Sequence, residues 1–68
     1  MALPAPNLSA QIASVQREIK LRRRLYPGRV SRGRMSPRQA LYEVACMEAV
    51  LTELMALHEA QQARELLR

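Results

Sequence analysis

Large apolar residues recur along the first part of the chain at intervals of three and four. The series runs Leu8, Ile12, Val15, Ile19, Arg22 and Tyr26, and Leu21 and Leu25 widen it. Because an α-helix turns once every 3.6 residues, this spacing places the series on one stripe of a helix. Asn7 or Ser9 can cap its start. Pro27 disfavours helical backbone at the preceding residue and Gly28 follows it, so we predict a helix over residues 8–25.

A second helical pattern starts after a clear capping signal. Ser36 at the cap position, Pro37 at the first helical position and Gln39 form a capping box. Neither Gly nor Pro occurs from Arg38 onward, where Ala, Leu, Glu, Met and Gln are abundant. We therefore predict a helix over 37–66, an extended leader over 1–7 and a basic turn over 26–36. In that turn we expect Gly28 and Gly33 to supply positive φ angles, and Val30 and Met35 to pack back.

These elements predict an all-α fold, a single-domain antiparallel hairpin over residues 1–68 whose second helix is the longer. The first helix would cover the second only to about Leu54 or Leu57, and an isolated helical overhang is marginal in water. We therefore expect a homodimer that forms a small helical bundle through the second helix. The expected dimer interface follows an apolar stripe of that helix: Val44, Met47, Leu51, Leu54, Leu57 and His58.

Charge divides the chain into a basic and an acidic part. The formal net charge is +5, yet residues 17–38 hold nine basic residues and one acidic residue, Glu18. Residues 39–68 hold two basic residues and five glutamates. The basic segment has three interpretations: a solvated hairpin end, a nucleic-acid contact, or a contact with an acidic protein surface. Arginine outnumbers lysine there, which favours planar recognition of carboxylate or phosphate.

The composition leaves little material for catalysis or metal binding. The chain has one cysteine, one histidine and no aspartate. These residues are too few for an internal disulfide, for the usual set of metal ligands or for a nucleophilic triad. We expect no enzyme activity and no cofactor, a packed thiol at Cys46, and a His58 that lies in an interface. The N-terminus lacks a signal-peptide pattern and no apolar run is long enough to span a membrane, which favours a soluble cytosolic protein.

We expect the basic turn and the first helix to carry the contact with a partner protein. Tyr26 is either a helix terminator with a half-buried ring or an aromatic anchor flanked by arginines. An alternative contact surface is the acidic stem of the second helix, with Glu48, Glu53 and Glu59. The candidate partner-binding residues are Arg22, Arg23, Arg24, Tyr26, Arg29, Arg32 and Arg34.

Two sequence segments resemble a family of small helical proteins encoded by bacteriophages and prophages. The first runs Arg22-Arg23-Arg24-x-Tyr26-Pro27-x-x-Val30-x-x-Gly33-Arg34-Met35-Ser36, and the second runs Glu43-Val44-Ala45-x-Met47-Glu48-Ala49-Val50. Size and helical make-up are also similar to the quorum-sensing anti-activator proteins of Pseudomonas phages. The resemblance implies a non-catalytic dimer in the host bacterial cytoplasm that binds and inhibits a host transcription activator and a pilus-assembly ATPase. The alternative is a small nucleic-acid-binding accessory protein of a phage.

Overall fold

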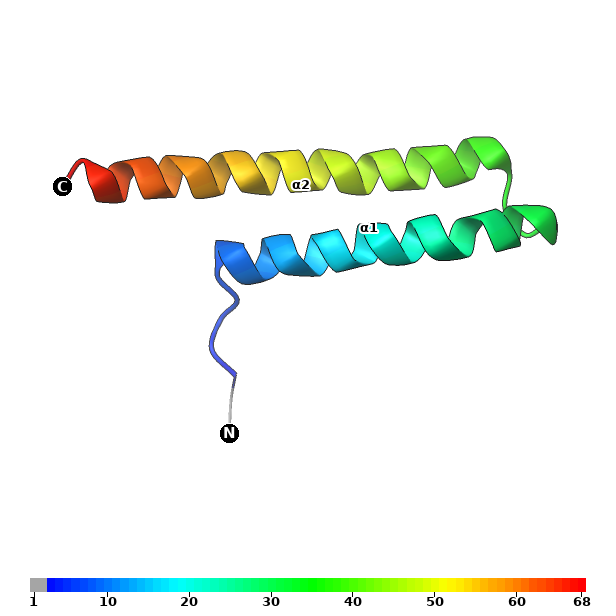
Figure 1. The fold of residues 1–68 in the computed structure, drawn as a ribbon, viewed down its shortest axis with the longest axis horizontal. Helices are drawn as coiled ribbons and strands as arrows, with labels where there is room; N and C mark the ends of the chain where they lie inside the picture. The colour runs from blue at the N-terminus through cyan, green and yellow to red at the C-terminus, as the bar shows by residue number, and fades with distance from the viewer. Residues whose placement is uncertain (1–2) are drawn as a thin grey trace.

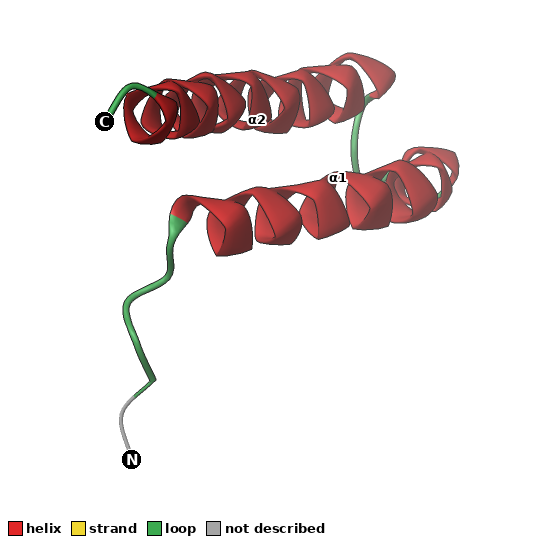
Figure 2. Cartoon of the chain, turned by 60° about the vertical axis from the view of Figure 1, so that its left-hand side comes forward, coloured by secondary structure: helices red, strands yellow, loops and turns green. Residues whose placement is uncertain are grey.

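The computed structural model describes residues 3–68, which fold as two antiparallel helices (Figure 1). Helix α1 spans Leu8–Ser31 and helix α2 spans Pro37–Leu66. Residues 32–36 join them in a short turn, and no strand occurs among the described residues (Figure 2). The expected all-α hairpin is thus confirmed, and α2 has the predicted bounds.

Both helices begin at side-chain caps that the sequence predicts. The Asn7 Oδ1 atom accepts a hydrogen bond of 2.8 Å from the backbone N–H of Ala10. The Ser36 hydroxyl accepts one of 3.0 Å from the backbone N–H of Gln39, with Pro37 at the start of α2. Each cap satisfies a backbone donor that has no partner inside its helix. Residues 3–7 form the exposed leader, and Met1 and Ala2 of the expected leader lie outside the described residues.

Helix α1 does not end near Leu25 but continues to Ser31 with Pro27 inside it, so the predicted boundary is wrong. Pro27 has no backbone N–H to donate to the carbonyl of Arg23, and proline inside a helix costs about 3 kcal/mol. The continued helix keeps Tyr26 on the same stripe as Ile19, where both are buried, and half-buries Val30 one turn later. We attribute the longer helix to this burial. The rules for proline and glycine consider only neighbouring residues and therefore do not include it.

The end of α1 is a Schellman motif centred on Gly33. Gly33 has φ +71°, its N–H donates to the Val30 carbonyl at 3.0 Å, and the Arg34 N–H donates to the Arg29 carbonyl at 2.9 Å. A left-handed residue after the last turn, followed by these two bonds, is a common way to stop a helix. Gly28 lies inside α1 without a positive φ, so of the two glycines only Gly33 plays the expected role.

The core between the helices is small. Ile19 is 5% exposed and Tyr26 is 9% exposed, and they are the only buried residues among residues 3–68. The rest of the seam consists of half-buried residues. From α1 these include Leu8, Ile12, Val15 and Val30, and from α2 they include Ala40, Val44, Met47, Leu51, Leu54 and His58. A single apolar seam therefore holds the hairpin together, as the two periodic stripes predict.

Helix α2 extends beyond the start of α1 (Figure 1). The Ser9 hydroxyl lies 3.3 Å from His58 Nε2, the hydrogen bond between the two helices that lies farthest along α2. Residues 59–68 are all exposed, including Leu66 at 86%. We call the helical part of this segment, residues 59–66, the overhang; at 1.5 Å per residue it projects about 12 Å.

Candidate binding surface

Arg22 lies between the two helices and holds them together. Its Nε donates to Glu18 Oε1 at 2.9 Å, and its Nη1 donates to the backbone carbonyl of Glu43 at 3.1 Å. The Glu43 carboxylate is 3.5 Å from the same Nη1. The hydrogen bond that Arg22 donates to Glu18 is the main reason that the pKa of Arg22 is raised above its ordinary value. Arg22 is therefore engaged within the hairpin, and its expected contact with a partner protein stays a prediction.

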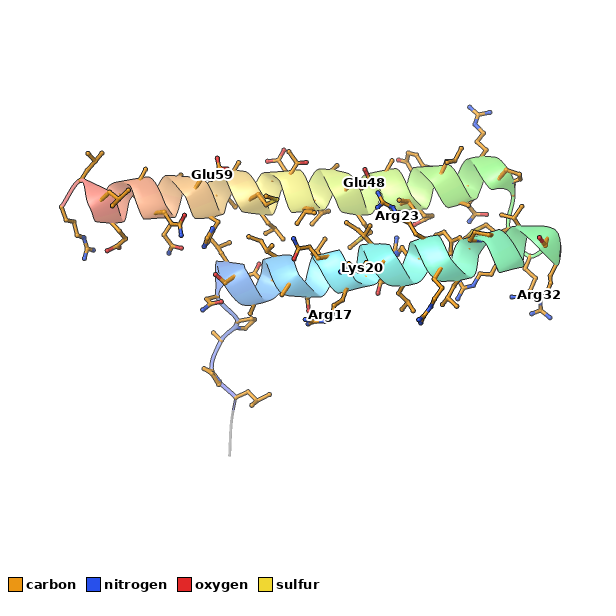
Figure 3. The ribbon with its side chains drawn as sticks, viewed as in Figure 1. Arg17, Lys20, Arg23, Arg32, Glu48 and Glu59 are labelled. Carbon is orange, nitrogen blue, oxygen red and sulfur yellow. The ribbon has the colours of Figure 1, made fainter. Side chains whose placement is uncertain are left out.

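Arg23 forms a second ion pair between the helices. Its Nη2 donates to Glu48 Oε1 at 2.8 Å, and both side chains are at least half exposed. In Figure 3 the Arg23 side chain points from α1 toward Glu48 on α2. An exposed pair of this kind contributes about 0.2–1 kcal/mol, so Arg23 is engaged within the chain but remains accessible from solvent.

Tyr26 is part of the core and not an exposed anchor, which corrects the expectation that it contacts a partner. Its ring is buried, and the guanidinium carbons of Arg29 and Arg22 lie 5.4 and 6.0 Å from its centroid. These distances are within the range of cation–π attraction. Arg29 therefore covers the ring from the solvent side, while its own side chain remains exposed.

Three exposed cations lie close together on the outer part of α1, and one of them, Lys20, also borders a hollow between the helices. Arg17, Lys20 and Arg24 are spaced three and four residues apart, line one shallow hollow together with Leu21, and are all exposed. None of the three forms an ion pair within residues 3–68, and Arg17 donates only to the Ser14 hydroxyl at 3.2 Å. We call these three residues the outer ridge.

The sequence analysis includes Arg24 among the partner-binding residues but omits Arg17 and Lys20. Helical spacing could have identified them, because Lys20 and Arg24 follow Arg17 at intervals of three and four residues, off the stripe of Ile19 and Tyr26. Arg32 and Arg34 remain exposed at the hairpin end, where Figure 3 labels Arg32. The expected set of arginines thus separates into two that hold the hairpin and others that are available for binding.

The acidic stem is only partly available. Glu48 is engaged by Arg23, whereas Glu53 and Glu59 are exposed and form no ion pair within residues 3–68. The expected dimer stripe also has an occupant: Val44, Met47, Leu51, Leu54 and His58 are half-buried on the side of α2 that α1 covers. That stripe is an interface within the hairpin and not a free face, because α1 reaches to His58. Leu57, the sixth expected residue, is 57% exposed.

Cys46 is a half-buried thiol, and its interaction with the Tyr42 hydroxyl is the main reason that the pKa of the Tyr42 phenol is raised. Residues 3–68 contain no group of three His, Cys or Glu side chains placed to hold a metal ion. Neither helix in the described part of the chain is long and apolar enough to cross a membrane.

Comparison with protein-family models, with curated proteins and with solved structures found no match. The resemblance to phage-encoded helical proteins therefore depends on the residues from Arg22 to Ser36 and from Glu43 to Val50 alone. What it implies about function is a proposal, and its support has to come from the surface described above.

Proposed function

We propose that this chain is a non-catalytic binding protein that uses the outer ridge to dock on an acidic surface of a host regulatory protein and inhibits it. The observation that carries the proposal is the division of the cations on α1. Arg22 and Arg23 have carboxylate partners inside the hairpin, whereas Arg17, Lys20 and Arg24 present their charge to solvent. Guanidinium groups that lack an internal partner are well suited to bidentate binding of carboxylates.

The same division favours the basic surface over the acidic stem as the contact. Of the three stem glutamates, Glu48 is already paired with Arg23, which leaves two separated carboxylates. The outer ridge offers three cations within two helical turns, and Arg32 and Arg34 add charge at the hairpin end. Clustered charge of one sign accelerates the encounter with a surface of the opposite sign.

The resemblance to phage-encoded proteins supports a specific class of target. On that basis the target is a quorum-sensing transcription activator in the host bacterial cytoplasm, and a pilus-assembly ATPase is a further target. The docking region would be an acidic patch of the activator, because its DNA-binding face is expected to be basic like this chain. The chain would then inhibit by occupying a regulatory or dimerisation surface rather than by imitating DNA.

The proposal is tested by direct binding to purified quorum-sensing activators of a Pseudomonas host. The variant that replaces Arg17, Lys20 and Arg24 with Gln removes the ridge charge with a residue that favours helix. We expect its affinity to fall at least about tenfold, which corresponds to roughly 1.4 kcal/mol.

The matched control replaces three exposed cations elsewhere, Arg38, Arg64 and Arg68, with Gln and so changes the net charge equally. It should bind within about twofold of the natural chain, since isolated surface charges contribute little. Equal losses in both variants would show that only net charge matters. Undiminished binding by the ridge variant would show that a different surface makes the contact.

A second candidate function, nucleic-acid binding, is favoured by the same unpaired cations, because a row of cations also suits a phosphate backbone. The described surface offers no exposed aromatic residue beside the ridge for stacking on bases, since Tyr26 is buried. Gel mobility of labelled duplex DNA separates the two functions. Binding at about 50 mM salt that weakens steeply by about 200 mM supports this alternative, and no shift at the lower salt excludes it.

A further inference from the structure

An apolar groove opens between the helices at the hairpin end. Pro27 and Val30 of α1 and Leu41 and Val44 of α2 line it, with Arg23 and Glu48 at its edge. Leu41 is 74% exposed, which is unusual for a leucine beside other apolar side chains. A groove of this composition gains free energy when another apolar surface covers it.

The overhang carries an apolar residue, Leu66, on the same flank of α2 as the groove. Leu41, Glu48, Met55 and Leu66 recur at intervals of seven, seven and eleven residues, which keeps them along one side of a helix. This flank lies about a quarter-turn from the stripe that α1 covers. Met55 is 43% exposed and Leu66 is 86% exposed. One flank therefore has an apolar groove at one end and an apolar projection at the other.

We propose that the groove receives the overhang of a second copy of the chain, in a two-fold dimer whose α2 helices run antiparallel. In this register Leu66 of each copy enters the groove beside Leu41 of the other, and the same contact occurs twice by symmetry. The α2 helix of each copy then has one neighbour across the seam and another a quarter-turn away, which is the arrangement of a four-helix bundle.

Charge favours the antiparallel direction. The register that pairs Leu41 with Leu66 places Glu59 of the second copy beside Glu48 and Arg23. Glu59 forms no ion pair within the described residues, and Arg23 lies at the groove edge with its side chain more than half exposed. Arg23 then lies between two carboxylates, one from each copy. A parallel pairing would instead bring the two basic hairpin ends together, which is unfavourable.

The size of the core also points to a second copy rather than an unrelated occupant. Only Ile19 and Tyr26 are buried within residues 3–68, which is little for two helices of this length. The overhang itself has no partner for about 12 Å, although isolated helical ends are marginal in water. Two-fold pairing would enlarge the small core and give the overhang a partner, because the groove of each copy covers the overhang of the other. This inference does not depend on the proposed host target.

The test is a directed disulfide in full-length protein whose Cys46 is replaced by Ser. The variant Leu41→Cys with Leu66→Cys should form a covalent dimer on mild oxidation, seen on a non-reducing gel. The two positions in one chain are about 38 Å apart along α2, so a bond within the chain is excluded. Both positions are exposed, so neither substitution removes a core contact, and circular dichroism checks that the helices remain.

The single variants Leu41→Cys and Leu66→Cys are the controls, and each should stay largely uncross-linked. Covalent dimers from the single variants at the level of the double variant would show parallel pairing or random collision, and would overturn the proposal. Sedimentation of the natural chain at about 50 µM should show a dimer; a folded monomer would mean that another molecule occupies the groove, and would equally overturn it.

A charge pair provides an independent measurement. Glu59→Lys should change the dimer dissociation constant by about tenfold, because position 59 of the second copy lies beside the Arg23–Glu48 ion pair. Glu53→Lys is the matched control, since Glu53 is equally exposed and unpaired within the described residues but lies on another side of α2. Equal effects of the two substitutions would contradict the proposed register.

Discussion

The two sides of α1 use the same type of residue for different purposes. On the inner side, Arg22 and Arg23 pair with Glu43 and Glu48 of α2, so their charge helps to join the helices. On the outer side, Arg17 and Arg24 belong to a ridge that has no carboxylate partner within residues 3–68. The difference teaches that a run of arginines is not one functional unit: helical geometry assigns neighbouring residues to separate tasks.

The largest expected effect comes from the inner side. Tyr26→Ala removes one of the two buried side chains, so the free energy of unfolding should fall by about 3–5 kcal/mol at a fixed protein concentration. Tyr42→Ala, at a tyrosine that is 68% exposed, should change it by less than about 0.5 kcal/mol. Chemical denaturation followed by circular dichroism measures both. Similar losses would mean that Tyr26 is not a core residue.

A smaller effect should come from Pro27, which interrupts the hydrogen-bond ladder of α1. Pro27→Ala restores an N–H that can donate to the Arg23 carbonyl, so we expect stability to rise by about 1–3 kcal/mol. The thermal midpoint should rise accordingly. A decrease would show that the proline shapes α1 in a way the inner side requires.

Arg22 and Arg24 give the most direct contrast between the two sides. Arg22→Gln removes charged hydrogen bonds to Glu18 and Glu43 and should lower the free energy of unfolding by about 1–2 kcal/mol. Arg24→Gln has no such partner to lose and should stay within about 0.5 kcal/mol of the natural chain. Denaturant titration of both variants under one set of conditions measures this difference. If the two values coincide, the inner arginine does not stabilise the hairpin.

The smallest effects should come from the two glycines. Gly33→Ala places a side chain at φ +71° and should cost about 1 kcal/mol, although nothing lies within 4 Å of the added methyl group. Gly28→Ala should instead stabilise by about 0.5–1 kcal/mol, because Gly28 is helical and the methyl group meets only the flexible end of Arg32. Opposite signs of the change in thermal midpoint would confirm that Gly33, and not Gly28, is the residue that terminates α1.

The sequence was sufficient to predict features that depend on local chemistry. The Ser36 cap, the bounds of α2 and the stripe from Leu8 to Tyr26 all follow from spacing and side-chain type. It was insufficient where a tertiary contact opposes a local rule. Pro27 predicts a helix end, but burial of Tyr26 and packing of Val30 favour continuation, and neither is evident before the partner helix is placed.

The binding surface shows the same limit. The distribution of charged residues locates the basic segment. It does not show which arginines form ion pairs with carboxylates of the other helix. Arg22 and Arg23 were included among the partner-binding residues. Their pairing with Glu43 and Glu48 is not evident from spacing, because these glutamates lie more than twenty positions away in sequence. Arg17 and Lys20 were omitted because the expected contact was centred on the turn, although their spacing already placed them with Arg24.

The most direct test of this division of tasks measures affinity and stability on one variant, with Arg17, Lys20 and Arg24 all replaced by Gln. The account predicts an unfolding free energy within about 1 kcal/mol of the natural chain, together with at least about a tenfold loss of affinity for the purified host activator. A variant that unfolds more easily, or one that binds undiminished, would contradict the assignment of the outer ridge to binding.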